Sequence, residues 1–132
     1  SNMVLEAASG SDVKLYVSTF YQEGGSPEFD DGIKAWLNED ATAMTNNGGN
    51  DTIAAVTAMG YDAYYVALEA LKAAGSTDPA AVKAALPGVT YTGVTGDIAF
   101  DDIGDAIRDT AYIKVADTAN NAWALETMQK AG

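Results

Sequence analysis

Apolar and polar residues alternate near the start of the chain. Val13, Leu15 and Val17 are separated by single polar or amphipathic residues. A repeat of two residues is typical of a strand with one buried face. We therefore predict a strand over residues 13–20.

Helical spacing begins at residue 26. Ser26 and Pro27 are residue types typical of the N-cap and the first position of a helix. The apolar residues of this helix fall on one stripe, which needs a core, and they are Phe29, Ile33, Trp36 and Leu37. Residues 45–50, rich in asparagine and glycine, predict a loop.

The longest predicted helix is capped by Asp51, starts at Thr52 and runs for about 20 residues until Gly75 stops it. The apolar residues with helical spacing in this segment are Ile53, Val56, Tyr64, Leu68 and Leu71. A shorter helix follows, which Asp78 caps and Pro87–Gly88 ends.

The remainder of the chain has the character of β structure. Short runs of β-branched or aromatic residues, divided by turn residues, occupy 89–95, 98–100, 111–115 and 122–127. Residues 117–121 predict a hairpin loop. The order of elements therefore predicts a mixed α/β fold.

Composition excludes several functions. The chain has 132 residues, the length of one ordinary domain, and its 19 acidic and 7 basic side chains give a net charge of −12. This charge repels polyanions, so we expect no nucleic-acid partner. Without cysteine or histidine the chain cannot build a zinc site or the usual serine or cysteine nucleophile. We therefore expect no catalytic residue, no metal and no cofactor.

The first residues stand apart from the rest. Ser1–Asn2 before Met3 resembles the remnant of a cleaved expression tag, so we set residues 1–3 aside and assign the fold to residues 4–132. No apolar run reaches the ~18 residues that a membrane span requires.

Two clusters have polar chemistry but the wrong spacing for a site. Asp97, Asp101, Asp102 and Asp105 crowd one turn, yet Gly104 is misplaced for a calcium-binding EF-hand loop. We interpret this cluster as a solvated acidic turn. Residues 47–50 are rich in glycine, but no lysine follows them as in a phosphate-binding loop.

Three tyrosines lie on the long predicted helix. Tyr64 and Tyr65 are spaced for packing in a core. Tyr61, which follows Gly60, is the better candidate for a residue of a ligand cleft or a hinge.

Several segments, taken in order, resemble the C-terminal part of type I periplasmic binding proteins. They are Gly60–Tyr61–Asp62–Ala63, Leu68–Glu69–Ala70–Leu71, Gly75–Ser76–Thr77–Asp78–Pro79, Gly93–Val94–Thr95–Gly96–Asp97 and Phe100–Asp101. The particular likeness is to the branched-chain amino-acid receptors of ABC importers, and it covers nearly everything after the first dozen residues. The resemblance implies a C-terminal fragment of a two-lobed α/β fold, with helices, short strands and terminal β hairpins.

In that family two lobes are joined by three crossovers. The resemblance implies that residues 4–18 and 112–132 belong to lobe two and residues 21–108 to lobe one. The crossovers then lie near 19–21 and 109–111. Their hinge residues are Thr19, Phe20, Asp109 and Thr110.

The family closes its lobes on a small ligand. The residues that hold the ammonium and carboxylate of an amino acid would lie upstream of this chain. Val56 matches a position where family members often place an aromatic residue against the ligand, so this sequence departs from the pattern there. Phe20 and Tyr21 at the crossover, together with Tyr61, are the other candidate ligand contacts.

Three functions can be compared. The leading hypothesis is an extracytoplasmic receptor, in the periplasm or at the cell surface and with or without a lipid anchor, that delivers an amino acid to the membrane permease of an ABC importer. The alternative is the ligand-binding sensor domain of a signalling receptor with the same fold. An enzyme that uses carboxylates alone would need a spaced pair of them, and the sequence indicates none. Uncovered strand edges and an apolar helix stripe also predict self-association of the fragment.

Overall fold

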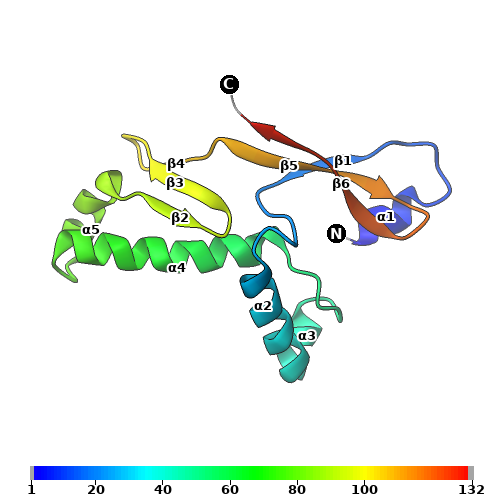
Figure 1. Ribbon diagram of the computed structural model, residues 1–132, viewed down its shortest axis with the longest axis horizontal. Coiled ribbons are helices and arrows are strands. Elements are labelled where there is room, and N and C mark those ends of the chain that lie inside the picture. The colour runs from blue at the N-terminus through cyan, green and yellow to red at the C-terminus, as the bar shows by residue number, and fades with distance from the viewer. Residues whose placement is uncertain (1, 131–132) are drawn as a thin grey trace. The chain divides into compact units, whose positions relative to one another are not determined.

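The computed structural model describes residues 2–130 (Figure 1). The chain divides into two compact units: the first combines the residues up to Gln22 with those from Asp109 onward, and the second is Glu23–Arg108. Each unit has its own three-stranded sheet.

The first unit is a short helix and an antiparallel sheet. Its elements are α1 (Asn2–Ala8), β1 (Tyr16–Thr19), β5 (Thr110–Asp117) and β6 (Ala122–Lys130). The sheet order is β1-β5-β6, with Tyr16 opposite Val115 and Thr110 opposite Lys130. The loop between β5 and β6 confirms the hairpin predicted at residues 117–121.

The prediction that the first strand buries one face is wrong. Val13 lies before β1 and is 59% exposed, and Val17 within it is 41% exposed. Alternation selects one face of a strand, but a second layer must cover that face before it is buried. In the first unit the buried apolar residues are instead Leu5, Ala8 and Tyr21.

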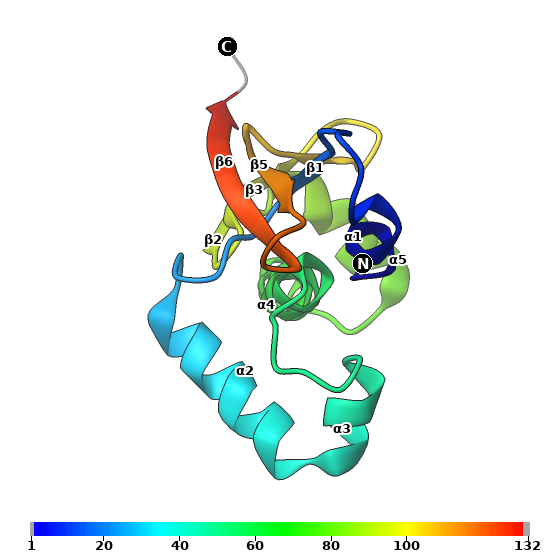
Figure 2. The same ribbon diagram turned by 90° about the vertical axis from the view of Figure 1, so that its right-hand side faces the viewer.

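The second unit combines helices with a small antiparallel sheet of order β2-β3-β4 (Figure 2). Its helices are α2 (Pro27–Glu39), α3 (Ala41–Asn46), α4 (Ala55–Ala74) and α5 (Pro79–Ala85), followed by a 3₁₀ turn at Leu86–Gly88. Its strands are β2 (Tyr91–Gly93), β3 (Gly96–Phe100) and β4 (Ala106–Ile107). The pattern of apolar residues did not predict β4.

Helix α2 begins as predicted, with Ser26 at the N-cap position and Pro27 as its first residue. Two of its four stripe residues, Phe29 and Leu37, are buried, whereas Trp36 is 53% exposed. The side chain of Ser26 makes no capping hydrogen bond. Asp30 of the first turn instead accepts a hydrogen bond of 2.6 Å from the Gly24 amide, which fixes the entry of the chain into α2.

Helix α3 occupies residues before and within the predicted loop. Asp40 caps it by accepting hydrogen bonds from the amides of Thr42 and Ala43 at 2.8 and 2.9 Å. The loop that follows is held by Asn47, whose side-chain amide donates to the carbonyls of Asn50 and Thr52. Of the predicted loop at residues 45–50, only 47–50 therefore lie outside a helix.

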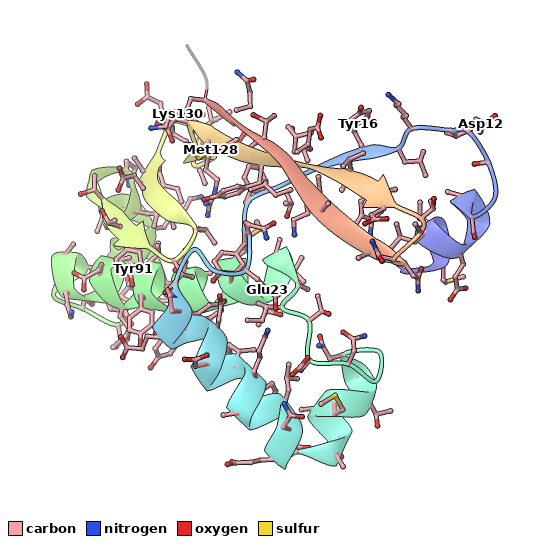
Figure 3. The ribbon with its side chains drawn as sticks, turned by 45° about the vertical axis from the view of Figure 1, so that its right-hand side comes forward. Asp12, Tyr16, Glu23, Tyr91, Met128 and Lys130 are labelled. Carbon is pink, nitrogen blue, oxygen red and sulfur yellow. The ribbon has the colours of Figure 1, made fainter. Side chains whose placement is uncertain are left out.

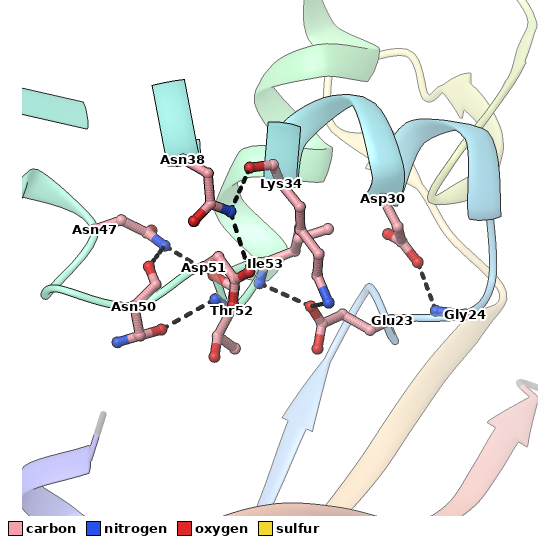
Figure 4. A network of polar contacts seen from close by, with 10 residues as sticks. All are labelled: Glu23, Gly24, Asp30, Lys34, Asn38, Asn47, Asn50, Asp51, Thr52 and Ile53. Atoms are coloured by element: carbon pink, nitrogen blue, oxygen red, sulfur yellow. Dashed lines mark hydrogen bonds and ion pairs between the residues drawn. The ribbon is translucent and has the colours of Figure 1, made fainter. Parts of the chain in front are cut away.

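A polar network fastens that loop to α2 (Figure 4). Glu23 accepts a hydrogen bond from the Ile53 amide and forms an ion pair of 3.2 Å with Lys34. Asp51 accepts a hydrogen bond from Asn38 and does not cap a helix, because α4 begins at Ala55. The predicted cap at Asp51 is therefore wrong.

Helix α4 has the predicted length and ends as predicted, with Gly75 in the left-handed conformation at φ 57°. Of its apolar residues Val56, Tyr64 and Leu71 are exposed, so the core position predicted for Tyr64 is wrong. The buried residues of α4 are Ala58, Asp62, Val66 and Ala70. Because α4 carries apolar residues all round, spacing alone does not decide which side is covered.

The core of the second unit lies where α4 meets α5 and the hairpin of β2 and β3. It contains Val66, Ala70, Val89 and Ile98, against which Val82, Leu86, Tyr91 and Phe100 pack. Asp78 caps α5 as predicted, by accepting a hydrogen bond of 3.0 Å from the Ala81 amide. Among the helices that the structure describes, none has the length and hydropathy needed to cross a membrane.

Candidate functional site

A cavity of about 560 Å³ opens between the start of α2, the middle of α4 and strand β2. All of its lining residues belong to the second unit. We call it the aromatic groove, and it is lined by Gly25, Ser26, Glu28, Phe29, Gly32, Ile33, Tyr61, Tyr91, Thr92, Gly93 and Val94. Its volume is in the range of sites that bind small molecules.

Aromatic rings connect the walls of the aromatic groove. Tyr61 lies 4.9 Å from Phe29 and 5.0 Å from Tyr65, measured between ring centroids. Tyr65 in turn stacks on Tyr91, with ring centroids 6.0 Å apart and an interplanar angle of 6°. Tyr91 is labelled in Figure 3. These separations are typical of favourable aromatic pairs. The rings therefore link α2, α4 and β2.

Tyr61 is the central ring and is 39% exposed. Its hydroxyl donates a hydrogen bond of 3.4 Å to the hydroxyl of Tyr65. This hydrogen bond, followed by desolvation and by nearby negative groups that include Glu28, raises the pKa of Tyr61 to about 12. Desolvation, followed by the charge of Asp62, also raises the pKa of Tyr91. Both phenols are therefore neutral at physiological pH.

Asp62 fixes the wall of the aromatic groove that β2 and its turn provide. Its side chain is fully buried and accepts hydrogen bonds from the amides of Val94 and Thr95 at 2.9 and 2.8 Å. The hydroxyl of Thr95 also donates to Asp62 and accepts a hydrogen bond of 2.7 Å from Arg108. A carboxylate with three donors is well satisfied inside a protein.

Gly93 is required by this arrangement. A Cβ atom at position 93 would overlap the carboxyl group of Asp62. Sequence reasoning did not identify Asp62 as a structural residue, although an acid placed directly between Tyr61 and Ala63 in a long helix was a usable signal. Its partners lie far along the chain, in the Gly93–Gly96 turn.

The four candidate ligand contacts predicted from the sequence are divided between the two units of the structure. Tyr61 lines the aromatic groove, whereas Val56 is 72% exposed on the first turn of α4 and does not line it. Phe20 and Tyr21 belong to the first unit, where Phe20 is 38% exposed and Tyr21 only 2%. Phe29 and Tyr91, which sequence reasoning did not select, complete the aromatic groove with Tyr61.

The candidate hinge residues lie at strand ends of the first unit. Thr19 is the last residue of β1 and Phe20 follows it. Thr110 is the first residue of β5, and its hydroxyl donates a hydrogen bond of 2.8 Å to Asp109. Of the two tyrosines predicted for the core, Tyr65 is half-buried, whereas Tyr64 is 62% exposed.

The acidic turn satisfies itself locally. Asp101 accepts hydrogen bonds from the amides of Ile103 and Asp105 at 3.0 and 2.8 Å. Asp102 is exposed. Within residues 2–130, no three acidic side chains are grouped so that they could hold a metal ion.

The described residues form a mixed α/β fold with a groove of a size that suits a small molecule. Residues 2–120 match the family model described as "Periplasmic binding protein". The chain therefore belongs to the periplasmic binding protein family, as its motifs predict, and its mixed α/β architecture fits a fragment of that fold.

A solved structure supports the same fold. The chain is similar to a leucine-binding protein, LivK, from Thermotoga maritima, with a TM-score of 0.67 and 23% sequence identity. The similarity covers 98% of this chain and 35% of that chain, so this chain spans about a third of the length of its structural relative. No curated protein matches the sequence.

Proposed function

We propose that the chain is the C-terminal portion of the solute-binding component of an ABC importer for branched-chain or related amino acids. The observation that carries this proposal is the family match over residues 2–120. The similarity to a protein described as leucine-binding favours this ligand class. The component works outside the cytoplasmic membrane, hands its solute to a membrane permease and catalyses no reaction.

The proposed mechanism is closure of two lobes on the solute. Residues 4–18 and 112–132 form part of lobe two, and residues 21–108 form part of lobe one. The division of the structure at Gln22–Glu23 and at Arg108–Asp109 supports this assignment. Thr19, Phe20, Asp109 and Thr110 then act as hinge residues, and the solute shifts the equilibrium toward the closed form.

The proposed solute contacts are the candidate residues of the sequence. Val56, Tyr61, Phe20 and Tyr21 contribute contacts to the side chain of the solute. The groups that hold its ammonium and carboxylate belong to the rest of the fold. This chain covers only 35% of the leucine-binding protein and has no counterpart of that remainder. The 132-residue chain alone is therefore expected to bind the amino acid weakly.

The isolated chain is proposed to self-associate. One face of α4 is exposed over four turns and carries no charge; its residues are Val56, Gly60, Ala63, Tyr64, Ala67 and Leu71. We call it the uncharged α4 face. Exposed apolar surface of this kind is typical of an interface, and a second copy of the chain is the partner always present in a purified sample.

Small-angle X-ray scattering with leucine tests the mechanism. We expect the longer protein that contains these residues to become more compact when leucine, isoleucine or valine is added, because closure brings the lobes together. A radius of gyration that stays constant at saturating ligand would contradict lobe closure.

A further inference from the structure

The aromatic groove has an unpaired carboxylate at its edge. Glu28 lies in the first turn of α2, is exposed and lines the groove. Within the part of the chain that the structure describes, the side chain of Glu28 makes no hydrogen bond and no ion pair. A negative charge therefore lines the same cavity as the rings of Phe29, Tyr61 and Tyr91, and no ion pair among the described residues balances it.

Three of the four basic residues in 23–108 are engaged elsewhere. Lys34 pairs with Glu23 and Lys72 pairs with Glu69 at 2.6 Å. Arg108 donates to both oxygens of Thr95. No basic residue lines the aromatic groove, and residues 23–108 contain fourteen acidic and four basic side chains. The local electrostatic potential therefore favours cations.

The aromatic walls restrict which cation fits. Ring faces attract organic cations that have a weak hydration shell, and the attraction is about 0.5–1 kcal/mol at exposed sites. A calcium ion needs six to eight oxygen ligands, which one carboxylate and three rings do not provide. We propose that the aromatic groove binds a substituted ammonium group, with its methyl or methylene groups against Tyr61 and Tyr91 and its charge toward Glu28.

This site shares Tyr61 with the proposed solute site but takes none of its other residues. All of its lining residues lie in Glu23–Arg108, so binding does not require closure of two lobes. Choline binding to the 132-residue chain is therefore a test of this site that does not depend on the importer function.

The test is a titration of the 132-residue chain with choline, followed by two-dimensional ¹H–¹⁵N NMR. We expect saturable shifts of the amides of Gly25, Phe29, Tyr61 and Gly93. The uncharged analogue 3,3-dimethylbutan-1-ol, which has the same shape, should bind at least fivefold more weakly. Equal binding of the two compounds, or no saturable shift at these amides, would overturn the proposal.

Two charge-removing variants on the same helix turn supply the control. Glu28→Gln should weaken choline binding about fivefold, because it removes the carboxylate beside the rings. Asp31→Asn removes the same charge from an exposed residue that does not line the aromatic groove, and should change the affinity less than twofold. Equal effects would show a general charge effect and would overturn the role of Glu28. Tyr61→Leu keeps an apolar side chain and should also weaken binding.

Discussion

Asp62 is the residue on which the local structure of the second unit depends most. It is buried in the middle of α4 and binds the turn that joins β2 to β3. A buried carboxylate without partners would cost several kcal/mol, but here three donors satisfy it. The same contacts set the position of Gly93 and Val94 in the aromatic groove.

Asp62→Asn should therefore destabilise the chain. The new amide group would face the Val94 and Thr95 amides, which are donors themselves, and about 2 kcal/mol of the free energy of unfolding should be lost. Urea unfolding followed by circular dichroism measures this change. Asp102→Asn is the control, because Asp102 is exposed and should stay within about 0.5 kcal/mol of the wild type. Similar losses in both variants would contradict the anchoring role of Asp62.

Tyr61 gives the chain a pH dependence in the alkaline range. Its pKa rises from 10.0 to about 12 in the folded chain, first through the hydrogen bond to Tyr65. The unfolded chain releases this proton first, so the contribution of Tyr61 to stability is complete below pH 10 and is lost as the pH rises toward 12.

Titration of tyrosine absorbance near 295 nm measures this behaviour. We expect a tyrosine component with a pKa of about 12 in the wild type, which Tyr61→Phe removes. Tyr112→Phe, in the first unit, is the control and should leave that component unchanged. A wild type whose tyrosines all titrate near 10 would contradict the environment described for Tyr61.

At the scale of elements, α4 carries two apolar faces with different roles. One face packs against the core of the second unit, and the uncharged α4 face is exposed. A helix that is apolar on all sides is typical of one covered on both sides. The proposed self-association uses the second face.

The variant Ala67→Glu tests whether the chain self-associates through the uncharged α4 face. The glutamate places a charge in the middle of this face, so the weight-average mass of the chain at high concentration should fall toward that of a monomer. Multi-angle light scattering measures the mass. Ala84→Glu, at an exposed position of α5, adds the same charge away from the face and should leave the mass unchanged. A wild type that is monomeric at every concentration would contradict self-association.

Features of the elements that depend on neighbouring residues were predictable from the sequence, whereas features that depend on distant segments were not. The end of α4 at Gly75 and the cap of α5 at Asp78 were predictable, because both are decided within one turn of the chain. The cap of α3 by Asp40 is equally local and could have been recognised. The buried face of α4 was not predictable, because Val89 and Ile98 of distant segments decide it.

The same distinction applies to the aromatic groove. Tyr61 was selected from its position beside Gly60 on the long helix. Phe29 and Tyr91 could not be linked to it, because they come from α2 and β2 and meet only in the folded second unit. Val56 was selected from a family position and lies outside the aromatic groove.

At the scale of the molecule, the chain covers only part of a larger fold. Residues 2–120 match the family, but the chain spans 35% of the leucine-binding protein to which it is similar. The exposed strand β1 and the uncharged α4 face are consistent with surfaces that the rest of such a fold would cover. Binding of the amino acid is accordingly expected from the longer protein.

A thermal-shift screen of the twenty amino acids, on the longer protein and on the 132-residue chain side by side, tests whether the protein is an amino-acid receptor. A ligand at about 100 times its dissociation constant should stabilise the folded protein by about 2.7 kcal/mol. We predict a rise in the melting temperature with leucine, isoleucine or valine in the longer protein, and a much smaller one in the 132-residue chain. No shift with any amino acid in the longer protein would contradict the proposed function.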